Sequence, residues 1–186
     1  MTSPINCLSI LVIPLLVTSI FYQASVGQPG IKIDDSSLTY LCKNSTDPTY
    51  CFKTLKADPD TFAGIGDKFH LGIVSIAIVN RTVSATAAQI PRILEKLSDR
   101  VDKIRMMDCK DDYNVVLDTV GLAYVSSDSR DYYGAMFMMQ DAASRLGECK
   151  NSYTAPPVRA SPIADGIAEA FKKFNIVDAV FGYMLL

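Results

Sequence analysis

Two cysteines at equal distances from a polar turn constrain this chain more than any other feature. The turn signal is Ser126-Ser127-Asp128-Ser129-Arg130, and Cys109 and Cys149 lie twenty positions before and after Ser129. Apolar residues recur at steps of three and four on both sides of the turn, which predicts two amphipathic helices. They are Met106, Cys109, Tyr113, Val116, Val120 and Ala123 before the turn, and Met136, Met139, Ala143 and Leu146 after it. Because antiparallel helices rise equally per residue, we expect a Cys109–Cys149 disulfide at the open end of a helical hairpin.

The N-terminus has the pattern of a secretory signal. The apolar run from Leu8 to Ile20 is interrupted by Pro14 and is shorter than the ~20 residues of a membrane-spanning helix. The small residues Ser25-Val26-Gly27 suit cleavage before Gln28. We therefore expect a signal peptide at residues 1–27 and a single secreted domain at residues 28–186.

The cysteine count agrees with export. Removal of residues 1–27 would remove Cys7 and leave four cysteines, an even set suited to an oxidising compartment. The hairpin geometry pairs Cys109 with Cys149, which leaves Cys42 to pair with Cys51.

Helix-start signals and apolar periodicity describe the rest of the chain. Asp47-Pro48 and Asp58-Pro59 each place a capping aspartate before a proline, which predicts short helices in the segment tied by Cys42 and Cys51. A long helix from about Asp67 should kink or end near Ile90, because Pro91 follows. Its expected apolar seam is Phe69, Ile73, Ile76, Val83, Ala87, Ile90, Leu94 and Leu97, with Asn80 in the one polar slot.

The C-terminal segment adds a last helix. Prolines break the linker from Tyr153 to Pro162, and helical spacing resumes with Ile167, Phe171, Phe174, Val177, Phe181 and Met184. Four long helices with short connections predict an all-α fold. We expect an up-down-up-down four-helix bundle with an N-terminal disulfide-tied helical hairpin.

Two glycosylation sequons lie in the part of the chain after residue 27. Asn44-Ser45-Thr46 falls in the loop between Cys42 and Cys51, where exposure and a glycan on Asn44 are expected. Asn80-Arg81-Thr82 places its asparagine on the expected apolar seam. A sugar on Asn80 would block packing, so modification is expected at Asn44 rather than at Asn80.

Composition and motifs argue against several function classes. The net charge of −2 and the pI near 5.3 give no basic surface for nucleic acid or for an anionic membrane. Zinc is disfavoured because no CxxC occurs and His70 is the sole histidine. No candidate nucleophile lies at a sequence spacing from His70 that would indicate a catalytic dyad or triad. The side chains of adjacent acidic residues point about 100° apart on a helix, so they do not converge on one substrate atom. We expect no enzyme activity, no cofactor and no membrane association of the mature form.

Tyr132 and Tyr133 follow the turn directly. Two adjacent side chains at a helix start cannot both face the core, so at least one tyrosine should be accessible. Exposed tyrosine at a rigid turn is typical of protein interfaces. A disulfide-bonded helical bundle without polar active-site residues suits binding better than catalysis.

The cysteine framework and its flanking residues resemble the plant invertase and pectin methylesterase inhibitor superfamily. The resemblance covers Leu38 to Leu186 and is carried by Cys42, Cys51, Leu55, Asp58-Pro59, Asp108-Cys109, Tyr113, Leu122 and Cys149. It implies a four-helix bundle with an N-terminal helical hairpin and the same two disulfides. It also implies secretion to the cell wall or apoplast, or to the vacuole, and reversible inhibition of a plant enzyme by a protein that is expected to be a monomer.

The turn distinguishes the two possible targets. Inhibitors that resemble the cell-wall invertase type place Pro-Lys-Phe between the two helices of the central hairpin. Here the matching positions read Tyr132-Tyr133-Gly134 after Asp131. Because the Pro-Lys-Phe motif of the invertase type is absent, we favour pectin methylesterase as the target by elimination, with cell-wall or vacuolar invertase as the alternative. The candidate target interface is Asp128, Arg130, Asp131, Tyr132 and Tyr133.

Two other classes fit the composition less well. A lipid-transfer module would also be secreted, helical and disulfide-bonded, but it usually carries four disulfides around a hollow core. An uncharacterised hydrolase would need His70 or an acidic pair to take part in the reaction.

Overall fold

The computed structural model describes residues 33–62 and 68–185, and within them the chain is all-α. The expected signal peptide at residues 1–27 lies outside the described residues. The helices are α2 (Asp35–Cys42), α3 (Pro48–Ala57), α4 (Lys68–Ala87), α5 (Ile90–Lys96), α6 (Arg100–Asp128), α7 (Tyr132–Thr154) and α8 (Ala164–Met184).

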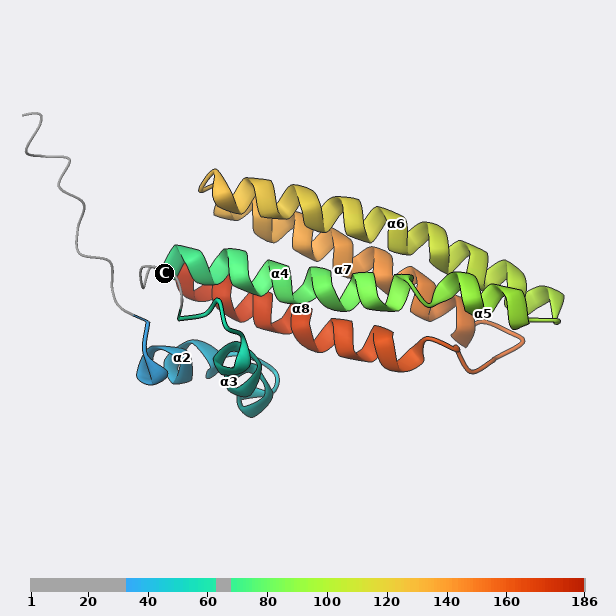
Figure 1. Cartoon of the computed structure of the whole chain (residues 1–186), viewed down its shortest axis with the longest axis horizontal. Coiled ribbons are helices and arrows are strands. Elements are labelled where there is room, and N and C mark those ends of the chain that lie inside the picture. Colours follow the sequence, from blue (N-terminus) through green and yellow to red (C-terminus); the bar gives the residue numbers. More distant parts are fainter. Residues whose placement is uncertain (1–32, 63–67, 186) are drawn as a thin grey trace, which may run out of the picture. The chain divides into compact units, whose positions relative to one another are not determined.

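Helices α4, α6, α7 and α8 form the expected up-down-up-down bundle (Figure 1). Helix α4 packs against α6 and α8, and α7 packs against the same two helices. Apolar side chains from all four helices fill the space between them, including Val83, Tyr113, Leu146 and Phe181, none of which is exposed to solvent. Burial of these side chains supplies the main stabilisation of such a bundle.

The hairpin of α6 and α7 is the longest antiparallel pair and closes as expected. Helix α6 ends in a Schellman motif, in which the Asp131 amide donates to the Ser126 carbonyl at 2.9 Å and the Arg130 amide to the Ser127 carbonyl at 3.0 Å. Arg130 occupies the left-handed position of this motif with φ 65°, where glycine is the usual residue. At the open end, Cys109 and Cys149 are joined by a disulfide with Cα atoms 4.7 Å apart.

Helix α4 has the expected break but a different apolar seam. It ends at Ala87, and Pro91 lies in the first turn of α5. Val79 is fully buried whereas Asn80 is exposed, so the expectation that Asn80 lies on the seam is wrong. The buried side uses Val79 because an asparagine in the same slot would bury an amide.

Helix α4 also belongs to the one stretch of the described chain that is long and apolar enough to cross a membrane. This stretch runs from Phe69 to Lys96 with a mean hydropathy of 1.4, and half of its most apolar window is buried inside the protein. Its apolar side is accounted for by packing within the bundle.

Helices α2 and α3 form the N-terminal helical pair, joined by the Cys42–Cys51 disulfide. Asp47 caps α3 as expected, because its side chain accepts a hydrogen bond from the Tyr50 amide. The second Asp-Pro expectation is wrong: Asp58 ends α3 instead of starting a helix. Its buried carboxylate pairs with Arg81 on α4, so a partner distant in sequence determines the role of Asp58.

The linker from α7 to α8 is held by a buried arginine of α6. Arg105 donates to the Pro157 carbonyl at 2.8 Å and to the Ala155 carbonyl at 3.0 Å. Only 8% of Arg105 is exposed, and carbonyl oxygens satisfy its charge in place of water. The irregular linker therefore has a fixed path over the start of α6.

Candidate functional site

The five candidate interface residues lie at the turn between α6 and α7, where they divide into structural and exposed groups. Asp131 caps α7, and its carboxylate accepts a hydrogen bond from the Gly134 amide at 2.9 Å. Tyr132 is half-buried, and its ring stacks on Phe69 of α4 with centroids 5.1 Å apart. Both residues therefore shape the turn, and Asp131 remains exposed.

Arg130 also braces the turn. Its guanidinium carbon lies 5.6 Å from the centroid of the Phe69 ring, within the range of a cation–π interaction. The Arg130 side chain therefore contacts the Phe69 ring on which Tyr132 stacks. The positive charge of Arg130 thus interacts with the Phe69 ring, although the Arg130 side chain remains exposed.

Tyr133 is the exposed aromatic side chain that the sequence led us to expect, with 68% of its surface accessible. Phe137 follows one helical turn later and is 71% exposed. Side chains four residues apart lie on the same face of a helix, so the two rings occupy neighbouring positions on α7. An exposed aromatic pair on a rigid helix is typical of a protein-binding surface.

Two exposed aliphatic residues of α6 face the same end of the hairpin. Leu122 is 57% exposed and Val125 is 60% exposed. The contact between the Ser126 hydroxyl and the Met138 sulfur, at 3.7 Å, shows that this turn of α6 lies beside the first turns of α7. We call Leu122, Val125, Tyr133 and Phe137 the hairpin-tip surface.

Acidic residues border the hairpin-tip surface. Asp118 lies one turn before Leu122, and Asp141 lies one turn after Phe137. Asp128 is exposed at the turn itself. An apolar centre with a charged rim is the usual anatomy of a protein–protein interface.

Sequence reasoning missed three of the four residues of the hairpin-tip surface. It identified Tyr133, but it did not name Leu122, Val125 or Phe137 as interface residues. Phe137 was detectable, because it lies two positions before the seam residue Met139 and therefore points away from the core side of the helix. Leu122 and Val125 fall outside the seam of Val116, Val120 and Ala123 in the same way.

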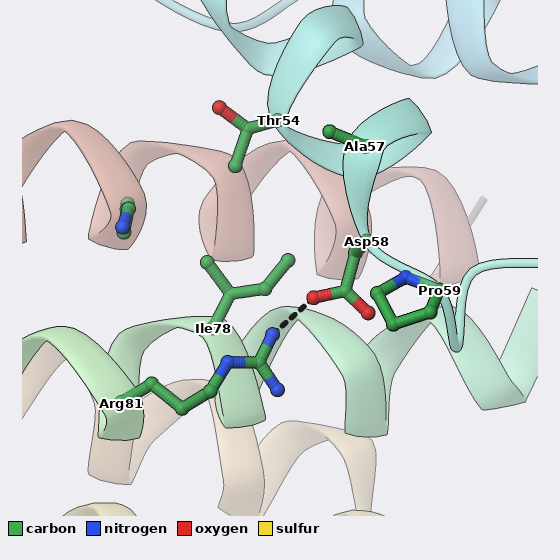
Figure 2. Close-up of a pocket in the computed structure, with 7 residues that line it drawn as sticks. Thr54, Ala57, Asp58, Pro59, Ile78 and Arg81 are labelled. Carbon is green, nitrogen blue, oxygen red and sulfur yellow. Dashed lines mark hydrogen bonds and ion pairs between the residues drawn. The ribbon is translucent and has the colours of Figure 1, made fainter.

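A second candidate is a cleft of about 470 Å³ where α3 meets α4 and α8. Thr54, Ala57, Asp58, Pro59, Ile78, Arg81 and Lys173 line it. Figure 2 shows the Asp58 carboxylate and the Arg81 guanidinium directed at one another across the cleft. Lys173 donates to the Thr82 hydroxyl at 2.7 Å, so both cations of the cleft take part in contacts within the protein.

A polar contact beside this cleft also ties α3 to α8. The Tyr50 hydroxyl donates to the Glu169 carboxylate at 2.5 Å, and this hydrogen bond, together with the nearby lysines, lowers the pKa of Glu169. The ionised Glu169 carboxylate is therefore one of the groups that hold α3 on the bundle, together with the Asp58–Arg81 pair. The cleft is a structural junction, with its charged groups already paired.

The described residues contain no arrangement for metal binding or nucleophilic catalysis. Within residues 33–62 and 68–185, no group of three His, Cys, Asp or Glu side chains could hold a metal ion. The Nε2 atom of His70 lies 2.9 Å from the Asp60 carbonyl. His70 thus contacts the backbone that follows α3 and has no nucleophile at hydrogen-bond distance among these residues.

Comparisons with known proteins agree with the helical framework. A pectinesterase inhibitor from Actinidia deliciosa is 26% identical over 151 residues, which cover 81% of this chain and 80% of that protein. A mutant form of a pectin methylesterase inhibitor from Arabidopsis has a similar crystal structure, with a TM-score of 0.67 and 16% identity. It is matched over 78% of this chain and 95% of that chain.

A second crystal structure, of a pectin methylesterase inhibitor from Arabidopsis thaliana, matches with a TM-score of 0.57 and 16% identity. The match covers 81% of this chain and 97% of that chain. At this level of identity the two structures show that the fold is shared. The family model described as plant invertase/pectin methylesterase inhibitor matches residues 36–177, and the chain therefore belongs to this family of inhibitors.

Proposed function

We propose that this protein is a secreted inhibitor of plant pectin methylesterase that acts by forming a reversible protein–protein complex. The hairpin-tip surface carries the proposal, because it exposes two aromatic and two aliphatic side chains on a helical pair that a disulfide and a capped turn hold rigid. A rigid surface loses little conformational entropy on binding, so more of the contact energy appears as affinity.

Pectin methylesterase is the preferred target for two reasons. The relative from Actinidia deliciosa is a pectinesterase inhibitor and is similar over most of both chains. In addition, the turn reads Asp131-Tyr132-Tyr133-Gly134 where inhibitors resembling the invertase type have Pro-Lys-Phe. Asp131 and Tyr132 are engaged in the cap and in the stack on Phe69, so the turn offers no equivalent three-residue probe.

Inhibition of cell-wall or vacuolar invertase is the alternative within the same family. The family description names both targets. An invertase could still be bound through Tyr133 and Phe137, which are available to any partner. A direct comparison of the two enzyme classes decides between them.

The proposed compartment follows from the cysteines. Both disulfides, Cys42–Cys51 and Cys109–Cys149, suit an oxidising compartment. We place the mature chain, residues 28–186, in the apoplast or cell wall, with the vacuole as the second possibility, after removal of residues 1–27. We propose that it acts as a monomer and carries a glycan on Asn44, which is exposed in the α2–α3 loop.

Alanine substitutions on the hairpin-tip surface test this function. Tyr133→Ala and Phe137→Ala should each weaken inhibition of pectin methylesterase by roughly thirtyfold, because truncation of an aromatic hot-spot residue costs about 2 kcal/mol. Melting temperatures should change little, since both rings are mainly exposed. The measurement is the inhibition constant from enzyme titrations at mildly acidic pH.

Val158→Ala is the matched control, since Val158 is equally exposed but lies in the linker between α7 and α8. It should inhibit like the parent protein. Unchanged inhibition by both Tyr133→Ala and Phe137→Ala would remove the hairpin-tip surface from the interface.

A further inference from the structure

In the folded protein, the asparagine of the second sequon, Asn80-Arg81-Thr82, is accessible to solvent. The sequence placed Asn80 on the buried side of a bundle helix, whereas the structure exposes it on α4. Among the described residues, the Asn80 side chain takes part in no hydrogen bond, ion pair or ring contact. Its amide nitrogen is therefore available, and an attached sugar would extend into solvent without displacing core side chains.

The neighbouring residues account for the contacts of this turn of α4. Arg81 reaches Asp58 after α3 (Figure 2), and the Thr82 hydroxyl donates to the Ile78 carbonyl and accepts from Lys173 of α8. Val79 and Val83 face the core. Asn80 and Arg81 are both exposed, but Asn80 is the one whose side chain has no partner among the described residues.

We propose that Asn80 is an N-glycosylation site of this protein, used together with Asn44. The proposal rests on the secretory route given above. In the reaction, the Asn80 Nδ2 atom attacks C1 of the first sugar of a lipid-linked diphosphate oligosaccharide. The N–C1 bond forms, the C1–O bond to the diphosphate breaks, the amide nitrogen loses a proton, and the lipid diphosphate leaves. Transfer occurs on the unfolded chain, so the later helix has only to tolerate the product.

The position of Asn80 gives the glycan a physical role. Asn80 lies within Phe69–Lys96, the described stretch that is apolar enough to cross a membrane. A bulky, hydrated sugar in the middle of this stretch opposes insertion into a bilayer and self-association. The hairpin-tip surface lies on α6 and α7 and Asn80 lies on α4, so we expect the glycan to leave that surface free.

Mass spectrometry of the secreted full-length chain from plant cells tests the proposal directly. Tryptic peptide 69–81 contains Asn80 and no other asparagine. After enzymatic removal of glycans in water enriched in ¹⁸O, this peptide should carry an aspartate with a heavy oxygen at position 80. An unmodified Asn80 in the secreted protein would overturn the proposal, and this measurement requires no variant.

Gel mobility of variants provides a second readout. Asn44→Gln should leave one glycan, Asn80→Gln should leave one, and the double substitution should abolish the shift caused by deglycosylation. Asn80→Gln should also inhibit pectin methylesterase like the parent protein. A glycan at Asn80 on a protein that inhibits no enzyme would refute the proposed function alone, whereas inhibition by a protein with unmodified Asn80 would refute this inference alone.

Discussion

Removal of the Cys109–Cys149 disulfide should destabilise the bundle more than removal of the Cys42–Cys51 disulfide. The two cysteines are 40 positions apart and fully buried. By loop-closure entropy, a cross-link of this length stabilises the fold by about 4 kcal/mol, and the nine-position Cys42–Cys51 link by roughly 2.6 kcal/mol. Cys109→Ala/Cys149→Ala should therefore lower the melting temperature by roughly 8–16 °C, at 2–4 °C per kcal/mol for a chain of this size.

The assay is thermal and urea unfolding followed by far-ultraviolet circular dichroism. Cys42→Ala/Cys51→Ala is the matched control, because it also removes one disulfide but closes a shorter loop at the periphery of the bundle. We expect a clearly smaller decrease in melting temperature for this control. An unchanged melting temperature in Cys109→Ala/Cys149→Ala would refute the stabilising role of the hairpin cross-link, and equal losses in the two variants would refute the dependence on loop length.

Three further substitutions test individual contacts. Arg105→Ala should lower the free energy of unfolding by about 3 kcal/mol, because two carbonyls lose a charged donor; a denaturant titration with a loss below 0.5 kcal/mol would contradict this. Gly166→Ala should cost about 1–3 kcal/mol, since the new Cβ would lie 2.5 Å from the Thr86 hydroxyl, and adding Thr86→Ala should restore part of the loss. Burial raises the pKa of Asp112, with Glu148 adding to the effect. A raised pKa means that protonation favours the folded state, so the ionised carboxylate is unfavourable at pH 7. Asp112→Asn should therefore raise the free energy of unfolding at pH 7, by less than about 1 kcal/mol. This gain should disappear below pH 3.8, the ordinary pKa of the group, and a gain independent of pH would disprove the assignment to its charge.

The hairpin was predictable because its determinants are local and periodic. Equal spacing of Cys109 and Cys149 from Ser129 gives the register of two helices without knowledge of any other part of the chain. The capping aspartates Asp47 and Asp131 act on amides three residues away. Such short-range chemistry is visible in a single sequence.

The two wrong predictions concern the role of Asp58 and the buried face of α4. Both depend on tertiary contacts that the local sequence does not show. Asp58-Pro59 has the form of a helix start, but Arg81, 23 positions later, takes the Asp58 carboxylate. On α4, two seams share Ile76 and Val83, and the periodicity alone did not choose between Val79 and Asn80. Val79 is the buried residue, because burial of the unpaired Asn80 amide would cost free energy.

The candidate interface shows the same division between local and tertiary information. The sequence predicted one accessible tyrosine after the turn, and Tyr133 is that residue. It did not predict that Tyr132 and Arg130 would be used on Phe69, which lies more than sixty positions earlier in the chain. Only the tertiary contacts separate residues that shape the turn from residues that can meet a partner.

Parallel titration of the mature protein against a plant pectin methylesterase, a cell-wall invertase and a vacuolar invertase determines which enzyme this protein inhibits. Residual enzyme activity is measured at mildly acidic pH as the molar ratio of protein to enzyme increases. We predict stoichiometric loss of pectin methylesterase activity and no loss of either invertase activity. Inhibition of an invertase alone, or of none of the three enzymes, would contradict this prediction.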